Sequence, residues 1–324
     1  MSAIHPANKI YVSGHHGMVG SAVCRALRRR GFENILTVGH ENLDLTDQQS
    51  VFDFFAAEKP EVQVVCAALV GGIVANDSYP GDFIGRNLMI QTNLLEAARR
   101  FSCTKTLFVA SSCIYPRDAT QPMHEEQLLS GALEPTNQWY AVAKLAGIKM
   151  GQAYRRQFGL DITSVLPTNL YGPGDNFDWK NSHVIPGIMR KLHAAKLSNA
   201  AVATIWGSGR AMREFMHVND LADALVFLMR QEDPPELLNI AYGEDWSIDD
   251  LALLIKKTVG FEGQLQYDQT QPNGPKRKLL ASDKLFGLGW RPRISLEKGL
   301  ADTYEWFLKN TEQLREVHPD TGRA

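Results

Sequence analysis

The fold of this chain is decided by the stretch Gly14-His15-His16-Gly17-Met18-Val19-Gly20. It directly follows the apolar, β-branched segment Ile10–Ser13 and opens Val19–Arg30, whose apolar residues have helical spacing. Glycines at such a junction permit a tight turn, a close approach of the backbone to pyrophosphate and close packing of helix on sheet. The helix N-terminus offers N–H groups to a phosphate. The pattern predicts a dinucleotide-binding site, with a simple packed turn as the alternative.

Strand-like and helix-like segments continue to alternate up to about residue 170. The expected strands are Ile10–Ser13, Ile35–Val38, Gln63–Ala67, Thr106–Ala110 and Ile162–Leu166. The expected helices between them are Val19–Arg30, Gln49–Glu58, Leu88–Phe101 and Ala141–Phe158. Because such alternation favours a parallel, doubly wound sheet, we predict an α/β fold of the Rossmann type.

The second half of the chain is less regular and richer in loops. Its loop signals are Gly172-Pro173-Gly174, Gly207-Ser208-Gly209 and Pro272-Asn273-Gly274, and its expected helices are Ile185–Ala195, Asn219–Arg230, Asp249–Val259 and Leu296–Asn310. We therefore expect a nucleotide-binding Rossmann domain in residues 1–170, with a later contribution near 215–243. Residues 171–324 would mainly form a smaller α/β lobe across a cleft, and the residues after Asn310 a frayed tail.

Composition excludes several classes of protein. The chain has 324 residues, enough for about two domains, and 34 Lys plus Arg against 36 Asp plus Glu, which leaves a net charge of −2. That balance provides no broad positive field for nucleic acid. The four cysteines lack C-x-x-C spacing, which favours a reduced, cytoplasmic setting. The longest early apolar run, Val64–Val70, is too short to span a membrane, and residues 1–8 contain no apolar signal region. We expect no nucleic-acid partner, no membrane partner and no metal site.

The end of the second strand predicts the choice of dinucleotide. An acid there favours NAD, whereas a cation favours the 2′-phosphate of NADP. His40 lies near this position, and no carboxylate stands at the strand tip itself, so NADP is preferred, while the neighbouring Glu41 keeps NAD open. Asp44, followed by Leu45, fits a turn near the adenine and could accept a hydrogen bond from its amino group. An acid that starts a helix is the equal alternative for Asp44.

Two further segments carry groups suited to proton transfer. Tyr140 and Lys144 are four residues apart and share one helix face, so the ammonium can lower the phenol pKa toward a useful range. Ser111 lies just past an apolar strand, at the carboxyl edge where open α/β sheets bind ligands, and its hydroxyl can polarise a carbonyl. Taken singly, Ser111 is more often a strand-end cap.

A strand-end Ser about thirty residues before Y-x-x-x-K is the arrangement of the short-chain dehydrogenase/reductase superfamily, and the whole chain resembles its extended, nucleotide-sugar-modifying branch. Within that branch it is similar to the GDP-L-fucose synthase family. The segments that carry this resemblance, besides the glycine turn, are Val70-Gly71-Gly72-Ile73-Val74-Ala75-Asn76, Ser111-Ser112-Cys113-Ile114-Tyr115-Pro116, Pro167-Thr168-Asn169-Leu170-Tyr171-Gly172-Pro173, Asn181-Ser182-His183-Val184-Ile185-Pro186, Trp206-Gly207-Ser208-Gly209, Met212-Arg213-Glu214-Phe215 and Arg277-Lys278-Leu279-Leu280.

The resemblance implies one reaction in two steps. These are 3,5-epimerisation of GDP-4-keto-6-deoxy-D-mannose and reduction of the 4-ketone with NADPH. Epimerisation beside a ketone needs a base and an acid, and Cys113 and His183 match the family's positions for them. A thiolate near neutral pH needs a lowered pKa, which a nearby imidazolium or the Tyr–Lys pair could provide. In the reduction, Tyr140 would donate the proton, Ser111 orient the ketone oxygen and Lys144 lower the phenol pKa and hold the nicotinamide ribose.

The expected binding residues follow from the glycine turn, the second strand end and the resemblance. For NADPH they are Gly14, His15, His16, Gly17, Met18, Val19, Gly20, His40, Asp44, Leu45, Val109, Ala110, Ser111, Lys144, Pro167, Thr168, Asn169, Leu170 and His183. For the GDP-sugar they are Ser112, Cys113, Asn169, Val184, Lys191, Trp206, Arg213, Asn273 and Lys278. His16 and His40 stand where better-known members carry Arg, and Asn273 where many have Asp. These departures permit a shifted substrate and a less strict choice of NADP.

Other functions stay open on the sequence. One is a C4 reductase, with or without epimerisation, of another GDP-4-keto sugar such as a GDP-deoxyheptose. A 4-epimerase or 4,6-dehydratase with tightly held NAD⁺ is another, although dehydratases generally need a carboxylate where Ser112 and Cys113 stand. A nucleotide-sensing module would lack catalysis altogether. The resemblance also implies a homodimer that packs Leu88–Phe101 and Ala141–Phe158 of each subunit into a four-helix bundle.

Overall fold

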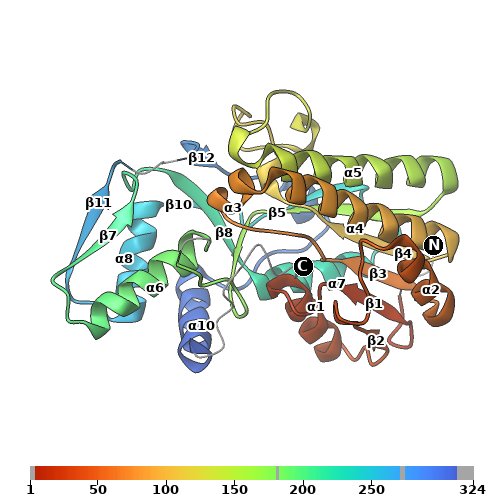
Figure 1. The fold of residues 1–324 in the computed structure, drawn as a ribbon, viewed down its shortest axis with the longest axis horizontal. Helices are drawn as coiled ribbons and strands as arrows, with labels where there is room; N and C mark the ends of the chain where they lie inside the picture. Colours follow the sequence, from red (N-terminus) through yellow and green to blue (C-terminus); the bar gives the residue numbers. More distant parts are fainter. Residues whose placement is uncertain (1–3, 180–181, 271–273, 312–324) are drawn as a thin grey trace.

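The computed structural model describes residues 4–179, 182–270 and 274–311. Two lobes lie side by side in Figure 1, a larger one that contains the N-terminal half of the chain and a smaller one that contains α6 (Val184–Leu197), α8 (Ile248–Val259) and α10 (Leu296–Lys309). The expected frayed tail, beyond residue 311, and Asn273 lie outside the described residues.

A six-stranded parallel sheet forms the centre of the larger lobe. Its order is β2-β1-β3-β4-β5-β9, so the order reverses between β1 and β3, which is where open α/β sheets bind ligands. The strands are β1 (Ile10–Ser13), β2 (Ile35–Leu36), β3 (Val62–Val65), β4 (Lys105–Val109), β5 (Asp161–Pro167) and β9 (Leu237–Ile240). The predicted doubly wound α/β fold is therefore confirmed.

Helices cover both faces of this sheet (Figure 1). One face carries α1 (Met18–Arg29) and α7 (Val218–Met229), which pack on each other, and the other carries α2 (Gln48–Glu58), α4 (Pro80–Arg100) and α5 (Gln138–Phe158). Because helices bury both faces, the residues of β1, β3, β4 and β5 are all buried, and these strands are largely apolar. Two separate hydrophobic clusters lie above and below the sheet.

Most elements differ from their predicted bounds by one to three residues, and helix α4 differs by more. Strand β2 ends at Leu36 rather than Val38, because it is an edge strand that pairs only with β1 among the described residues. Helix α4 begins at Pro80, eight residues before the predicted start. Glycines and polar residues in its first two turns conceal the helix in the sequence, whereas Pro80 at the first helical position and burial of Phe83 stabilise it.

The smaller lobe combines short strands with three helices. Its helices α6 (Val184–Leu197), α8 (Ile248–Val259) and α10 (Leu296–Lys309) surround a third hydrophobic cluster. Its strands, none of them predicted, are β6 (Asn169–Tyr171), β7 (Val202–Trp206), β8 (Met212–His217), β10 (Asp245–Ser247), β11 (Gln264–Asp268) and β12 (Arg277–Lys278). Most are short or have polar residues, so they lack a clear period-two pattern. Short helices α3 (Ile73–Ser78) and α9 (Asp283–Gly287) complete the fold.

The buried carboxylate of Glu214 on β8 joins segments from distant parts of the chain. It accepts hydrogen bonds from the backbone N–H of Tyr242 (2.8 Å), Gly243 (2.7 Å) and Leu280 (3.1 Å). The Glu214 carbonyl accepts a further bond from the Asn169 side chain at 2.7 Å. Burial raises the pKa of the Glu214 carboxyl. These bonds fix β8 against the segments that follow β5 and β9, which is where the candidate site lies.

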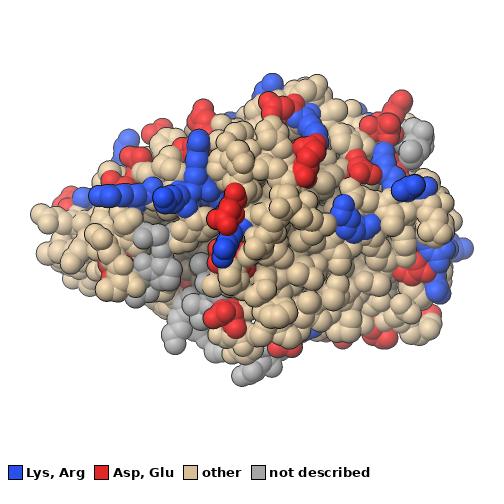
Figure 2. All heavy atoms as spheres, turned by 90° about the horizontal axis from the view of Figure 1, so that it is seen from above, with Lys and Arg blue, Asp and Glu red and all other residues tan. Residues whose placement is uncertain are grey.

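Surface charge is mixed. Figure 2 shows Lys and Arg interspersed with Asp and Glu on the face seen there. Within the described ranges, no helix has the length and apolar character needed to cross a membrane, and no group of three or more metal-ligating side chains is found.

Candidate active site

The glycine turn after β1 packs closely against the end of β3. Gly14 has φ +71°, in the left-handed region that favours glycine, and a Cβ there would lie 2.8 Å from the Ala67 amide nitrogen. A Cβ on Gly20 would overlap the Gly14 carbonyl. The turn therefore requires both glycines and brings the start of α1 to the point where the strand order reverses.

The start of α1 has the features of an anion site. Gly17 is its N-cap, without a side chain to accept from the first amides, and its first turn contains no acidic residue. The rings of His15 and His16 lie next to each other beside it, with centroids 3.9 Å apart and planes tilted by 54°, and burial together with His16 lowers the pKa of His15. Open N–H groups at a helix N-terminus suit a pyrophosphate, so these residues fit a bound dinucleotide.

The adenosine end of the site contains a cation that the sequence did not reveal. His40 is exposed, and hydrogen bonds from Thr46 to the Asp44 carboxylate lower the pKa of Asp44, with smaller contributions from the charges of His40 and Arg86. Arg86 therefore lies near enough to Asp44 for its charge to act there, although it belongs to the part of α4 that was not predicted as helix. Asp47, rather than Asp44, caps α2. Leu45 is half-buried behind this turn.

Ser111 and Cys113 lie together just beyond β4. Ser111 caps the short 3-10 helix Ser112–Ile114, its hydroxyl accepting from the Cys113 amide at 3.3 Å and donating to the Cys113 sulfur at 3.1 Å. Ser112 itself is buried. The Asn137 side chain donates to the Cys113 carbonyl at 3.2 Å. No signal in the sequence distinguished Asn137 from an ordinary loop asparagine. In the structure, its hydrogen bond fixes the backbone of the segment that carries the Cys113 thiol.

Tyr140 and Lys144 project from α5 into the same region. Both are buried, and the Lys144 ammonium donates to the Val109 carbonyl at 3.0 Å and lies 5.9 Å from the centre of the Tyr140 ring. Burial lowers the pKa of Lys144 to about 8. Burial, followed by the charge of Cys113, raises the pKa of Tyr140. Tyr140 is thus kept as a neutral phenol that can donate a proton, with a cation beside it.

Cations from the smaller lobe approach this cluster. Arg213 on β8 and Lys278 on β12 are register partners in paired strands, and both are half-buried. Burial lowers the pKa of each, and the charge of Cys113 acts on Lys278. Residues 113, 213 and 278 thus come from three parts of the sequence to one place. Two cations beside an acid/base cluster suit a substrate that carries a pyrophosphate.

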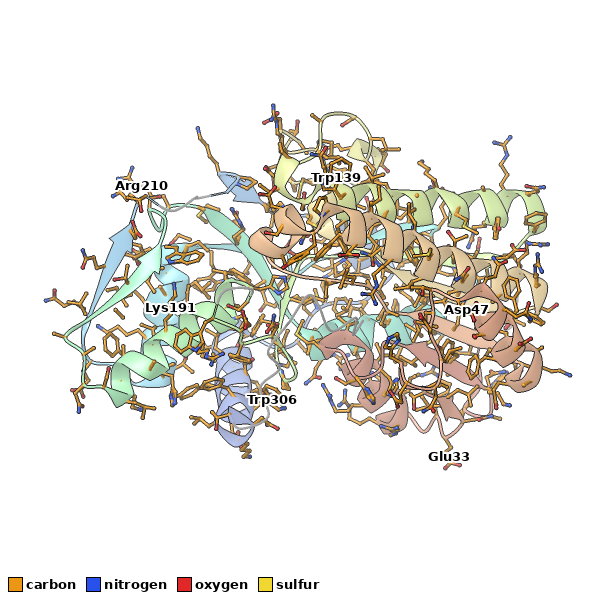
Figure 3. The ribbon with its side chains drawn as sticks, in the orientation of Figure 1. Glu33, Asp47, Trp139, Lys191, Arg210 and Trp306 are labelled. Atoms are coloured by element: carbon orange, nitrogen blue, oxygen red, sulfur yellow. The ribbon has the colours of Figure 1, made fainter. Side chains whose placement is uncertain are left out.

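Lys191 and Trp206 form a second pair in the smaller lobe. The Lys191 ammonium lies 4.4 Å from the centre of the Trp206 ring, and half of the Trp206 surface is exposed. Figure 3 labels Lys191 beside α6 in this lobe. An exposed indole with a cation over it suits a stacked base or ribose. Val184, the first residue of α6, is half-buried.

The remaining expected cofactor residues lie at the carboxyl ends of two central strands. Val109 ends β4 and Ala110 follows it, while Pro167 ends β5 and is followed by Thr168, Asn169 and Leu170. Thr168 and Asn169 both donate to the Glu214 carbonyl, at 3.3 and 2.7 Å. Glu214, a residue of the smaller lobe, thus orients the side chains of Thr168 and Asn169.

His183 stands apart from this cluster in the sequence and in its contacts. It is the N-cap residue of α6, but its side chain does not bond to that helix, and 53% of the side chain is exposed. Its Nδ1 lies 3.9 Å from the Asp175 carboxylate, which raises the pKa of the imidazole. The sequence did not single out Asp175, which follows Gly174 in what looked like an ordinary turn.

Known proteins resemble this chain in sequence and in fold. Residues 10–241 match the model of the NAD dependent epimerase/dehydratase family. The chain is 53% identical to GDP-L-fucose synthase 1 of Arabidopsis thaliana, over 93% of this chain and 94% of that protein. A solved GDP-L-fucose synthetase from Naegleria fowleri bound to NADP has a TM-score of 0.89 at 27% identity, over 97% and 98% of the two chains. A GDP-6-OMe-4-keto-L-xylo-heptose reductase from C. jejuni has a TM-score of 0.89 at 33% identity, over 95% and 100%. The chain therefore belongs to the NAD dependent epimerase/dehydratase family and, within it, to the group of the GDP-L-fucose synthases.

Proposed function

We propose that this protein converts GDP-4-keto-6-deoxy-D-mannose to GDP-L-fucose, by 3,5-epimerisation followed by reduction of the 4-ketone with NADPH. The observation that carries the proposal is the cluster of Ser111, Cys113, Tyr140 and Lys144 at the strand ends next to the glycine turn. The relatives named GDP-L-fucose synthase match along nearly the whole chain, so the GDP-sugar is preferred over other nucleotide sugars.

In the epimerisation, Cys113 and His183 exchange protons with the sugar. The 4-ketone acidifies the carbon-bound protons at C3 and C5, one of the two side chains removes such a proton, and the other returns one to the opposite face. The ketone must be held still while this occurs. The Ser111 hydroxyl, which donates to the Cys113 sulfur at 3.1 Å in the structure, turns its proton to the ketone oxygen when the sugar binds.

In the reduction, the same ketone is held at Tyr140. NADPH, when bound, supplies the hydride that reaches C4. Tyr140 gives its proton to the ketone oxygen, and Lys144 places a positive charge beside the phenol as negative charge develops on it. One binding site serves both steps because the ketone that acidifies C3 and C5 is the ketone that is later reduced.

The two lobes divide the binding. Residues 1–170, with the contribution near 215–243, hold NADPH through the glycine turn, the strand ends and the adenosine turn. Residues 171–324 mainly hold the GDP part, with Arg213 and Lys278 on the pyrophosphate and Trp206 with Lys191 on the base or ribose. Val184 and Asn273 complete the expected GDP contacts.

Label exchange tests the proposal. Purified protein with the 4-keto substrate and NADPH in deuterated water is expected to give GDP-fucose labelled at C3 and C5. Cys113→Ser is expected to stop the exchange, whereas the control Cys103→Ser, at a buried thiol that donates to the Pro60 carbonyl, is expected to keep it. Product without label would show a C4 reductase instead, and turnover without added NADPH would show a 4-epimerase or dehydratase. Unchanged exchange in Cys113→Ser would remove Cys113 from the mechanism.

We also propose a homodimer that forms through α4 and α5. These helices pack on each other and expose apolar side chains, among them Met89, Val142 and Phe158, each more than 40% exposed. Trp139 at the start of α5 is also 41% exposed (Figure 3). Light scattering is expected to give twice the chain mass, and Val142→Asp to give the chain mass. A single-chain mass for the unmodified protein would exclude the dimer.

The four cysteines are free thiols, in keeping with the cytoplasm as the expected location, which cell fractionation would test.

A further inference from the structure

Asp175 is a buried carboxylate that faces His183. It lies in the turn after β6, its amide donating to the Gly172 carbonyl at 3.1 Å, and its side chain is only 3% exposed. One carboxylate oxygen, Oδ1, accepts from the Asn176 amide at 2.7 Å and lies 3.9 Å from His183 Nδ1. The carboxylate is therefore on the protein side of the imidazole, while about half of the His183 side chain is exposed.

The second oxygen of this carboxylate, Oδ2, is buried and has no hydrogen-bond partner among the described residues. Leaving a buried carboxylate oxygen unpaired costs free energy, so this position favours a nearby cation or N–H donor. His183 Nδ1 lies 3.9 Å from the other oxygen, Oδ1, and the protonated imidazole places a positive charge beside this buried carboxylate.

We propose that Asp175 is a positioning residue that orients the His183 imidazole and holds it in the protonated form during epimerisation. This inference rests on the proposed function, since it assumes that His183 exchanges a proton with the sugar. Asp175 itself touches neither the sugar nor the cofactor in this proposal. Its buried side chain acts only through Nδ1 of His183.

The geometry assigns different tasks to the two ring nitrogens. Nδ1 faces the carboxylate, so its proton stays in that contact and fixes the ring orientation. Nε2, on the far side of the ring, then carries the proton that can be given to the sugar carbon. When Nε2 gives up this proton, the imidazole becomes neutral and keeps its Nδ1 proton toward Asp175, and solvent restores the proton at Nε2. The present 3.9 Å separation would shorten to a hydrogen bond when substrate closes the site.

The groups around the imidazole support this assignment. Asp175 raises the pKa of His183 in two ways, by hydrogen bonding and by its negative charge. Burial of the imidazole acts in the opposite direction and lowers this pKa. His183 does not bond to the first turn of α6, so the helix does not compete for Nδ1. Without the carboxylate, the ring would be free to rotate and the pKa of His183 would be lower, since burial would act on it unopposed.

Two measurements on Asp175→Asn test the inference. This variant keeps the size of the side chain and removes its charge, and Asp178→Asn makes the same change three residues away as a control. The first measurement is the pKa of His183 by NMR titration, with its signal assigned by comparison with His183→Gln. The second is deuterium exchange into the 4-keto sugar without NADPH, measured as a function of pH.

Asp175→Asn is expected to lower the pKa of His183 and to slow exchange at neutral pH by about tenfold or more. The loss should be smaller at acidic pH, where His183 is protonated without help, and should vanish in a His183→Gln background. Asp178→Asn should change neither quantity.

A pKa of His183 at or below about 6.5 in the unmodified protein would overturn the inference even if Asp175→Asn did not fold. An equal loss in the His183→Gln background would overturn it too, because Asp175 would then act on the fold. If His183→Gln exchanges label normally while the pKa still depends on Asp175, the proposed role of His183 has failed rather than the contact.

Discussion

The Tyr140→Phe variant separates the two steps of the proposed reaction. The substitution removes one oxygen and keeps a ring that packs against Ala75 and Phe83, so the free energy of unfolding should change by less than about 1 kcal/mol. Tyr140 is only 8% exposed, so water is poorly placed to replace its proton. General acid catalysis contributes roughly a hundred- to ten-thousandfold, or about 2.7–5.4 kcal/mol of barrier, and the reduction should slow by that factor.

The assay follows both steps in one deuterated sample. Loss of NADPH absorbance reports the reduction, and mass spectrometry of the 4-keto sugar before NADPH is added reports exchange at C3 and C5. Exchange is expected to stay within a few fold, because Cys113 and His183 remain. Tyr154→Phe is the matched control, since it removes a phenol from the same helix where it donates to Glu96 at 2.8 Å, and it should keep both rates. Full reduction by Tyr140→Phe would refute the assignment of the proton donor, and equal loss of both steps would mean that Tyr140 serves substrate binding instead.

Three further predictions follow from particular contacts. Burial lowers the pKa of Lys144 to about 8, so the ammonium is charged below that pH and the reduction rate should fall as pH rises through it. A reduction rate that does not change between pH 6 and pH 10 would contradict this prediction. His40→Arg places a permanent cation at the exposed adenosine end and should lower the KM for NADPH two- to fivefold, about 0.5–1 kcal/mol, with little change for NADH; equal gains for both would argue against a 2′-phosphate contact. Glu214→Ala leaves three backbone N–H groups without their acceptor and should reduce the free energy of unfolding in urea by about 3 kcal/mol or more, whereas a change below about 1 kcal/mol would mean that water replaces the carboxylate.

The sequence predicted the larger lobe well because its signals are local. A glycine turn between strand and helix, short buried strands rich in apolar residues such as β1 and β3, and amphipathic helices such as α1 all depend on residues close together in the chain. The helices of the smaller lobe had the same kind of signal and begin within one residue of their predicted starts. The strands of that lobe were missed because they are short or polar and depend on partners from elsewhere. Met212–His217, for example, pairs with three different strands.

The candidate site shows the same division. Ser111, Tyr140 and Lys144 could be predicted from spacing, and Cys113 and His183 only from resemblance to a known family. Asn137, Arg86 and Asp175 were missed, since each acts through a neighbour far away or across a turn, and nothing in the local sequence marks such a contact.

By itself, the sequence determined that a parallel sheet places a glycine turn, a strand-end serine and a Tyr–Lys pair at one edge. Only the tertiary structure decided which charges surround them. Burial of Lys144 lowers its pKa, strand pairing places Arg213 opposite Lys278, and the charge of Cys113 acts on Lys278. The physical reason is that periodicity and turn chemistry act over a few residues, whereas desolvation and charge interactions depend on distances in space between residues that the chain keeps far apart.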